Sequence, residues 1–333
     1  MKKKILSLTM ALCTFLSVMT GCGNNDKPQN EQGTQKQVVS ADINIGCMKG
    51  PTAIGMIKLL SDSDAGKSVN TYHYTIAGTA DEISTGLIKG DLDVAAVPCN
   101  LASVLYNKTE GEIVTVAVNT LGVLYIVEAG EAVNSVQDLK GKTIYSTGQG
   151  TTPEYTLRFL LTSAGINPDS DVDIQYKSEA PEVLAALTQN PDAVAMLPQP
   201  YTTVALNSND TYRIALDVTK EWEKLNDGTV VTGVLVARKD FIEKNKEAFN
   251  AFLDEYKAST SYASANIDDT AALLESFDIF KAAIAKKAIP YCNVTYITGD
   301  DMKEKVLSYL KVIYDQNPAA VGGKIEEGMF YID

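Results

Sequence analysis

The 333-residue sequence contains a single histidine, His73, and a single tryptophan, Trp222. Its five cysteines include no Cys-x-x-Cys pair. Structural zinc sites are built from four closely spaced Cys and His ligands, which this composition does not offer. The sequence therefore argues against a zinc site, and we expect neither a metal ion nor a cofactor.

Basic residues are also in the minority. The chain has 29 Lys and Arg against 42 Asp and Glu, which gives a formal net charge of −13. Proteins that bind nucleic acid or anionic membrane surfaces use an excess of positive charge. We therefore expect no nucleic acid and no anionic membrane surface as a partner, and specific binding is expected at a local site.

An apolar run at the N-terminus, from residue 5 to residue 18, follows three lysines. It is shorter than the roughly 20 residues that cross a membrane and it ends in small residues, which is typical of an export signal over residues 1–21. The ending Met-Thr-Gly-Cys resembles the lipobox of bacterial lipoproteins, in which Cys22 would be the lipid-bearing first residue of the mature protein. The alternative is an ordinary cleaved signal with an incidental cysteine.

Removing residues 1–21 would take away three lysines and no acidic residue, so the net charge would change from −13 to −16. Residues 22–40 have almost no apolar side chains, which predicts a flexible tether between lipid and domain. The remainder, about 290 residues, is enough for two domains of ordinary size.

After the tether, short β-rich runs alternate with helical runs. This pattern predicts an α/β fold whose sheets are mainly parallel, with helices on both faces. The expected strands are residues 43–45, 72–76, 94–97 and 113–118, then 143–145, 172–176, 194–197 and 212–216. The final hundred residues are expected to be mainly helical and to pack on the first half. In sheets of this kind, ligands bind outside the carboxyl ends of the strands.

The two halves are related by an offset of 100 residues. The strand, loop and helix of residues 43–60 match those of residues 143–160. The match continues without a gap through residues 79–98 and 179–198. A period of this length indicates two copies of a domain, because solenoid repeats are much shorter.

The strand, loop and helix of residues 143–165 form the clearest candidate binding element. Gly148 and Gly150 allow backbone conformations that are closed to other residues. Thr152 is predicted as the N-cap of the helix and Pro153 as its first residue, where a missing N–H costs nothing. The free N–H groups of the first turn would then face a negatively charged or strongly accepting ligand group.

Two extended runs, residues 119–127 and 229–237, are expected to carry the chain between two lobes and to act as a hinge. They predict a first lobe of residues 42–122 plus 233–333. The second lobe is then residues 123–232.

Several parts of the sequence resemble one known family. These are the lipobox, the strand-loop-helix of residues 43–60, the segment SVQDLKGK at residues 135–142 and the return strand that ends VARKDF at residues 236–241. They are similar to the substrate-binding proteins of nitrate, sulfonate, taurine and thiamine-precursor ABC importers. The resemblance covers roughly residues 42–315.

The resemblance implies a two-lobed periplasmic-binding-protein fold of type 2. It also implies that a solute enters the cleft, that the lobes close over it, and that the closed form docks on a membrane permease with its ATPase subunits. Such a protein would be an extracytoplasmic, lipid-anchored monomer.

In each lobe, two junctions between a strand and a helix should face the cleft. The candidate ligand-binding residues at these junctions are Lys49, Gly50, Thr52, Asn100, Gln149, Gly150, Thr151, Thr152, Gln199 and Tyr201. They offer backbone N–H groups, hydroxyls, amides and one cation, which suits a small polar or singly anionic solute. The cation, Lys49, could instead be a solvated charge at the rim.

A ring-bearing solute could also stack on aromatic residues. The candidates are Tyr125, Tyr155, Tyr201 and Trp222. For Trp222, packing under a loop is the simpler interpretation.

The candidate cleft has no Ser/His/Asp or Cys/His set and no carboxylate pair, and the chain has no Gly-x-x-x-x-Gly-Lys phosphate loop. We therefore expect that the protein is not an enzyme. The lobed fold also occurs in enzymes of menaquinone and thiamine-precursor biosynthesis, so catalysis stays as a less favoured alternative. The other alternative is an extracytoplasmic ligand sensor. Genes for a permease and an ATPase beside the gene for this protein would argue against that alternative.

Three cysteines remain beyond the signal and the lipid site: Cys47, Cys99 and Cys292. A bond between Cys47 and Cys99 is conceivable, because both follow strands of the first lobe. The sequence does not give the separation on which such a bond depends.

Overall fold

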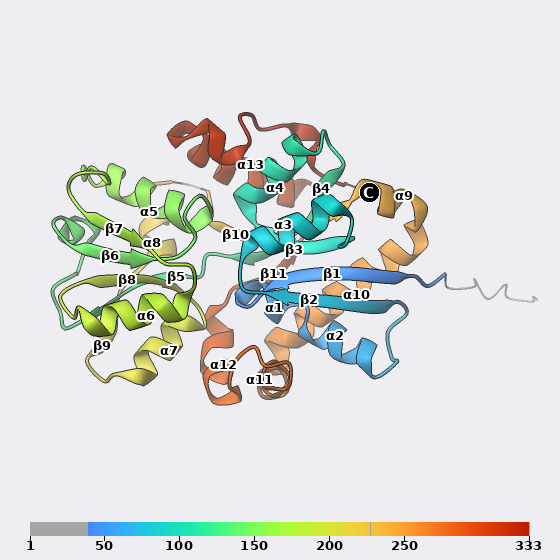
Figure 1. Cartoon of the computed structure of the whole chain (residues 1–333), viewed down its shortest axis with the longest axis horizontal. Helices are drawn as coiled ribbons and strands as arrows, with labels where there is room; N and C mark the ends of the chain where they lie inside the picture. Colours follow the sequence, from blue (N-terminus) through green and yellow to red (C-terminus); the bar gives the residue numbers. More distant parts are fainter. Residues whose placement is uncertain (1–38, 227, 333) are drawn as a thin grey trace, which may run out of the picture. The chain divides into compact units, whose positions relative to one another are not determined.

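The computed structural model describes residues 39–226 and 228–332. The predicted signal, Cys22 and most of the predicted tether lie outside these residues. Within them the chain forms two α/β lobes, each built around one β-sheet (Figure 1). The two-lobed α/β fold expected from the sequence is therefore confirmed.

The sheet of lobe 1 has six strands in the order β11-β4-β10-β3-β1-β2. The strands are β1 (Asp42–Met48), β2 (Thr71–Ala77), β3 (Val94–Pro98), β4 (Ile113–Leu121), β10 (Val231–Arg238) and β11 (Val294–Ile297). β1 pairs in parallel with β2 and β3, whereas β10 is antiparallel to both β3 and β4. β4 therefore runs in the same direction as β1 to β3, and β10 is a reversed strand between them.

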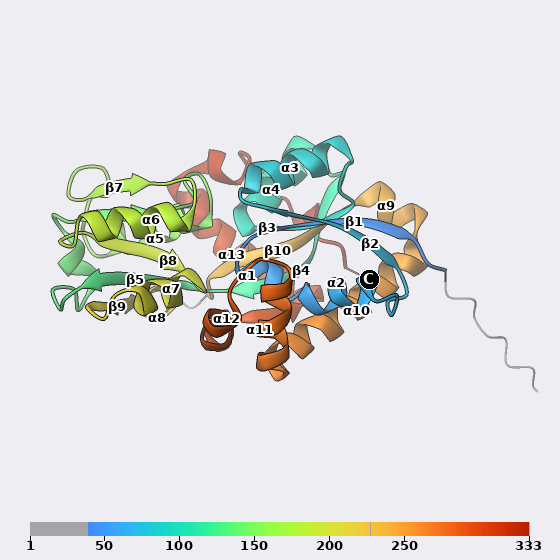
Figure 2. The same cartoon turned by 60° about the horizontal axis from the view of Figure 1, so that its bottom comes forward.

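Helices cover both faces of this sheet (Figures 1 and 2). Those of the first half are α1 (Pro51–Ile54), α2 (Ile57–Asp64), α3 (Ala80–Lys89) and α4 (Cys99–Lys108). The C-terminal part adds α9 (Lys239–Lys244), α10 (Lys246–Ala265), α11 (Ile267–Ser276), α12 (Ala282–Ala288) and α13 (Gly299–Gln316). Short 3-10 turns follow at η2 (Ile289–Tyr291), η3 (Pro318–Val321) and η4 (Glu327–Met329).

Strand β3 shows why the sheet needs helices on both sides. All five of its residues are buried, as expected of a short, wholly apolar run. Because side chains alternate along a strand, Val94 and Ala96 join the hydrophobic cluster on one face, and Ala95 and Val97 join the cluster on the other.

The sheet of lobe 2 has five strands in the order β7-β6-β8-β5-β9. The strands are β5 (Leu124–Ala129), β6 (Thr143–Ser146), β7 (Asp173–Tyr176), β8 (Val194–Pro198) and β9 (Tyr212–Asp217). The helical elements are η1 (Val136–Leu139), α5 (Thr152–Ser163), α6 (Ala180–Gln189), α7 (Tyr201–Ser208) and α8 (Val218–Glu223).

The two lobes repeat one topology. The order β2-β1-β3-β10-β4 in lobe 1 corresponds to β7-β6-β8-β5-β9 in lobe 2. The offset of 100 residues seen in the sequence holds for both ends of β3 and β8 and for the first and last residues of α3 and α6. This shared strand order is what a duplicated domain predicts.

Both sheets are mixed. Each lobe contains one reversed strand that follows a crossing from the other lobe, and lobe 1 has a second one, β11, which is antiparallel to β4. β5 follows the crossing out of lobe 1, and β10 follows the return crossing. The parallel strands run toward the cleft between the lobes, so a chain that arrives from the opposite lobe enters at the cleft edge. Its first strand must then run the opposite way.

The two crossings are short. The first is residues 122–123, where a Cβ atom on Gly122 would lie 2.0 Å from Thr219 Oγ1, so only glycine fits. The second connects α8, which ends at Glu223, with β10, which begins at Val231, and there Gly228 O accepts a hydrogen bond from Trp222 Nε1 at 2.9 Å. Trp222 is 1% exposed. The prediction that Trp222 packs under a loop is therefore confirmed.

Helix α13 forms a further contact between the lobes, although the sequence analysis placed it on lobe 1 alone. It packs on α4, β4 and β10 of lobe 1 and also on α5 of lobe 2. On the lobe 2 side, the Tyr309 hydroxyl is hydrogen-bonded to the Thr156 hydroxyl. The Tyr309 ring also lies 5.2 Å from that of Trp222.

Tyr309→Phe should lower the free energy of unfolding by about 1 kcal/mol, because one buried hydrogen bond between the lobes is lost while the ring packing is kept. Urea denaturation followed by circular dichroism measures the change. Tyr314→Phe is the matched control, since Tyr314 lies on the same helix and is only half-buried. Equal losses for both variants would contradict a specific role for the Tyr309 hydroxyl.

Candidate functional site

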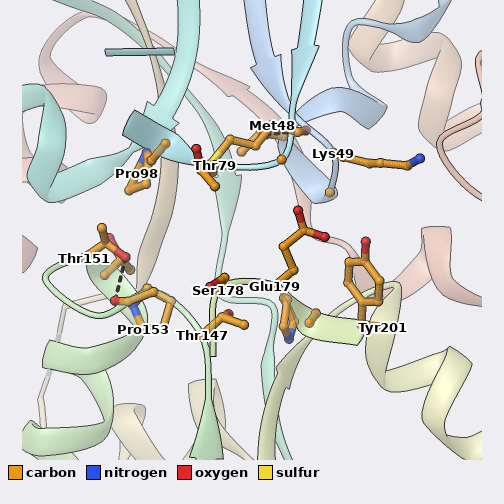
Figure 3. Close-up of a pocket in the computed structure, with 18 of the residues that line it drawn as sticks. Met48, Lys49, Thr79, Pro98, Thr147, Thr151, Pro153, Ser178, Glu179 and Tyr201 are labelled. Atoms are coloured by element: carbon orange, nitrogen blue, oxygen red, sulfur yellow. Dashed lines mark hydrogen bonds between the residues drawn. The ribbon is translucent and has the colours of Figure 1, made fainter. Parts of the chain in front are cut away.

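The parallel strands of both lobes end at a common cleft with a volume of about 510 Å³ (Figure 3). Lobe 1 contributes the β1–α1, β2–α3 and β3–α4 turns, and lobe 2 contributes the β6–α5, β7–α6 and β8–α7 turns. Each turn leads into the start of a helix, where backbone N–H groups have no partner within the helix. The cleft therefore lies where parallel strands were expected to place a ligand site.

Seven of the ten candidate ligand-binding residues line this cleft. They are Lys49, Gly50, Thr52, Gln149, Thr151, Thr152 and Tyr201. The other three candidates, Asn100, Gly150 and Gln199, are described by the structure but are not among the lining residues.

Asn100, at the start of α4, connects the lobes behind the cleft wall and is 1% exposed. Its Nδ2 donates to Gly150 O of lobe 2 at 3.1 Å and to Ala320 O of η3 at 2.9 Å. Its Oδ1 accepts a hydrogen bond from Thr152 Oγ1 at 3.4 Å. Because both polar atoms are used by the protein, the structure places Asn100 at an interlobe contact.

Gln199 is 2% exposed and turns into lobe 2. Its Oε1 accepts hydrogen bonds from Thr203 N at 3.3 Å and from Thr203 Oγ1 at 2.8 Å. The side chain therefore supports the first turn of α7 and does not line the cleft.

The turn after β6 has the expected shape, but its donors are partly occupied. Gly148 and Gly150 have φ angles of 75° and 76°, a region that favours glycine. The N-cap is Thr151, and Thr152 is the first helical residue, so the predicted cap is wrong by one position. Gly150 N donates to a carboxylate oxygen of Glu154 at 2.7 Å. Gly150 precedes the N-cap, so the Glu154 carboxylate lies beside the first helical turn and accepts from the loop before it.

At the starts of two more helices, a glutamate of the first turn accepts a hydrogen bond from a residue at or just before the N-cap. At α6, Ser178 N donates to Glu182 Oε2 at 3.0 Å. At α3, the Thr79 hydroxyl donates to Glu82 Oε1 at 3.0 Å. Arg158 Nε holds the glutamate of α5 by a hydrogen bond of 2.9 Å. The glutamates at the starts of α6 and α3 therefore add negative charge that disfavours an anion beside them, whereas Arg158 balances the charge of the α5 glutamate.

The sequence analysis missed two of the turns, β2–α3 and β7–α6. Their lining residues are Gly78, Thr79, Ala80 and Asp81 in lobe 1, and Tyr176, Lys177, Ser178, Glu179 and Ala180 in lobe 2. The sequence does contain a pattern that points to these two turns, because residues 79–83 align with residues 179–183 when the numbering is shifted by 100. Only the four junctions with obvious glycines, prolines or amides were selected.

Thr79 and Glu179 occupy equivalent positions as the N-caps of α3 and α6. Both side chains project into the space between the lobes (Figure 3). An atom at the Cβ position of Gly78 would lie 2.6 Å from Glu179 Oε1. The Glu179 carboxylate therefore reaches across the cleft to the opposite lobe.

The cleft wall contains two lysines, Lys49 and Lys177, and neither is paired with a carboxylate of the wall. Lys49 is exposed, and Figure 3 shows that its side chain extends away from the other labelled side chains. Lys177 Nζ lies 5.5 Å from the centre of the Tyr145 ring of lobe 2. Burial and the nearby charge of Glu179 raise the pKa of Tyr201, so this phenol stays protonated and can donate.

Of the four aromatic candidates, only Tyr201 lines the cleft. Tyr125 and Tyr155 are buried in lobe 2, and the Tyr155 hydroxyl accepts a hydrogen bond from Asn317 Nδ2 at 3.4 Å. Tyr176, which was not a candidate, is the second aromatic residue in the wall. Burial, with a smaller effect of Glu154, raises the pKa of its hydroxyl as well.

Cys47, Cys99 and Cys292 are free and buried, so the conceivable Cys47–Cys99 bond is not formed. Burial raises the pKa of each thiol, to about 12 for Cys47, which keeps the thiols unreactive.

Among residues 39–226 and 228–332, no group of three or more His, Cys, Asp and Glu side chains is placed to hold a metal ion. In the same part of the chain, no helix combines the length and apolar character needed to cross a membrane.

A family model described as NMT1/THI5 like matches residues 100–270, just over half of the sequence. The chain belongs to the NMT1/THI5-like family. No curated protein sequence matches this family member.

Solved structures share the fold of this family member. An ABC transporter protein from Parabacteroides distasonis is 24% identical, with a TM-score of 0.72, and the match covers 87% of this chain and 98% of that one. The aliphatic sulphonate binding protein SsuA from Escherichia coli is 17% identical, with a TM-score of 0.70 and coverage of 87% and 92%. The nitrate-binding protein NrtA from Synechocystis PCC 6803 is 12% identical, with a TM-score of 0.65 and coverage of 86% and 84%. At these identities the likeness establishes the fold.

Asn100→Ala should lower the free energy of unfolding by about 2 kcal/mol, because two buried carbonyl groups lose their donor. Asn100→Asp should cost at least as much at neutral pH, since a carboxylate would face the same two carbonyl oxygens. Urea denaturation measures both variants, and Asn134→Ala on the exposed surface is the control. Wild-type stability of the aspartate variant would contradict the assigned contacts.

Proposed function

We propose that the chain is the extracytoplasmic solute-binding lipoprotein of an ABC importer. The observation that carries this proposal is the cleft between two duplicated lobes, lined from both sides by the starts of helices. Membership of the NMT1/THI5-like family supports it. So do fold neighbours that are named an ABC transporter, a sulphonate-binding protein and a nitrate-binding protein.

A small polar solute enters the open cleft and contacts groups from both lobes. The proposed contacts are Lys49, Gly50, Thr52 and Thr79 of lobe 1 and Gln149, Thr151, Thr152, Glu179 and Tyr201 of lobe 2. Several hydrogen bonds made as the lobes close can supply the roughly 8 kcal/mol of micromolar binding. The two short crossings, residues 122–123 and the connection from α8 to β10, act as the hinge between the lobes.

The closed form is then recognised by a membrane permease, which works with an ATPase. The protein acts as a monomer, and residues 22–40 tether it to a lipid carried by Cys22. The proposed activity is binding of a solute without chemical conversion. Such binding needs no catalytic residues in the cleft.

The test is a screen of purified protein by thermal shift against sulfonates, nitrate, bicarbonate, pyrimidines, aromatic acids, vitamins and organic amines. A ligand that binds the folded state raises the melting temperature. Calorimetry should then give one site per chain, and small-angle scattering should give a smaller radius of gyration with the ligand. A bound ligand located outside the cleft would overturn the assignment of the site.

Gly50→Trp should abolish binding of the solute that the screen finds, because Gly50 lines the cleft and no atom lies within 4 Å of its Cβ position. The bulky ring would therefore fill the cleft without straining the fold. Gly50→Ala is the matched control, and calorimetry should show at most a small change in its affinity. Undiminished affinity of the tryptophan variant would place the binding site elsewhere.

Cys22→Ala should release the protein from the membrane, because the thioether to lipid can form only on the cysteine. Detergent phase partition and labelling with a radioactive fatty acid measure the anchor in a bacterial host. The wild-type chain should enter the detergent phase and carry label, and the variant should do neither. An unlabelled wild-type chain would contradict lipid attachment.

A further inference from the structure

We infer that the cleft selects a solute that carries a positively charged nitrogen group, an ammonium or an amidinium, and that Glu179 binds this group. The inference rests on the proposed function and names the chemical class of its solute. It differs from the sulfonate and nitrate that appear in the names of the fold neighbours.

The helix starts give the first reason. An oxyanion in such a cleft would bind to first-turn N–H groups and the positive ends of helices. Here the starts of α5, α6 and α3 are each bordered by a glutamate of the same helix: Glu154, Glu182 and Glu82. Glu182 and Glu82 therefore offset part of the positive potential at α6 and α3, whereas Arg158 balances the charge of Glu154 at α5.

Glu179 gives the second reason. Its side chain is exposed to the cleft, and within the described residues its carboxylate makes no hydrogen bond or ion pair with the protein. It faces Gly78 of the opposite lobe, which has no side chain that could meet it. Asp81, in the first turn of α3, adds a second carboxylate to the same wall. An unpaired carboxylate between closing lobes requires a partner that donates hydrogen bonds.

The arrangement of the basic residues gives the third reason. Among the lining residues that the structure describes there is no arginine. The two lysines of the wall do not meet Glu179, because Lys49 extends away from the centre and Lys177 lies over the Tyr145 ring. A solute cation would therefore be the main positive charge beside Glu179.

The aromatic residues fit the same class of solute. Tyr201 lies near Glu179, and its ring packs edge-on against Phe280 at 5.1 Å, which fixes its orientation. Tyr176 lies in the wall as well. Aromatic faces attract cations, and a cleft of about 510 Å³ accepts a solute with one ring.

The comparison of the two lobes identifies Glu179 as the residue that sets specificity. Its equivalent in lobe 1 is Thr79, so the two N-caps that face the gap differ by one charge. The duplicated fold provides the cleft, and the Thr79/Glu179 difference adds a carboxylate that faces the opposite lobe.

The experiment measures binding to the purified full chain by calorimetry, with three probes that share one ring. Benzamidine is the cation, benzamide the neutral analogue and benzenesulfonate the anion. Benzamidine should bind at least about tenfold more tightly than benzamide, as expected of a charge-assisted hydrogen bond, and benzenesulfonate should not compete. High salt should weaken only the binding of benzamidine.

Glu179→Gln should remove the preference for benzamidine and weaken its binding by about tenfold or more while leaving benzamide unchanged. Glu131→Gln is the matched control, since it removes one exposed charge from the same lobe outside the cleft. Circular dichroism and melting temperature show whether each variant is folded. Glu179→Asp should retain part of the preference, because the charge stays while its reach is shortened.

The outcomes separate the inference from the proposed function. Tighter binding of benzenesulfonate than of benzamidine would overturn the inference while leaving a solute-binding protein. No binding of benzamidine at millimolar concentration would also overturn it. Failure of every compound in the wider screen would count against the proposed function itself. An equal preference for benzamidine in the Gln variant would show that Glu179 does not bind the cation.

Discussion

The starts of six helices, three from each lobe, meet at the cleft and determine which groups line it. Parallel strands must each be followed by a helix, so the first turns of several helices meet at one edge of each sheet. Here Glu154 and Glu182 accept from the backbone N–H just before the N-cap, and Glu82 accepts from the hydroxyl of the N-cap Thr79. Glutamates thus occupy positions beside helix starts that offer anion sites in other proteins, and the Glu179 carboxylate projects into the cleft without a hydrogen bond or ion pair to another described residue.

The duplication explains how one cleft arises between two lobes. Each copy has strands that run toward the gap, and each receives one reversed strand from the other copy, β5 or β10. Helix α13 and Asn100 hold the lobes together behind the cleft. If the lobes close over a solute as proposed, the rear contact and the two short crossings are the parts about which they would rotate.

The sequence predicted the architecture well because apolar runs and the offset of 100 residues are global patterns. The strands, the two lobes and the place of seven of the ten candidate residues in the cleft wall follow from such patterns. Single side chains were less predictable, because Asn100 and Gln199 differ from cleft residues only in the direction their side chains take. Glu179 was missed because a glutamate before a helix resembles an ordinary N-terminal acid. The N-cap differed by one residue, since Thr151 and Thr152 are equally good caps by type.

A crystal structure of the protein with the solute identified by screening tests the central claim most directly. The account predicts that the solute lies between the lobes and that a nitrogen atom of the solute is within hydrogen-bonding distance of the Glu179 carboxylate. A solute oxyanion bound at the turn of residues 148–152, with Glu154 displaced from Gly150, would contradict it.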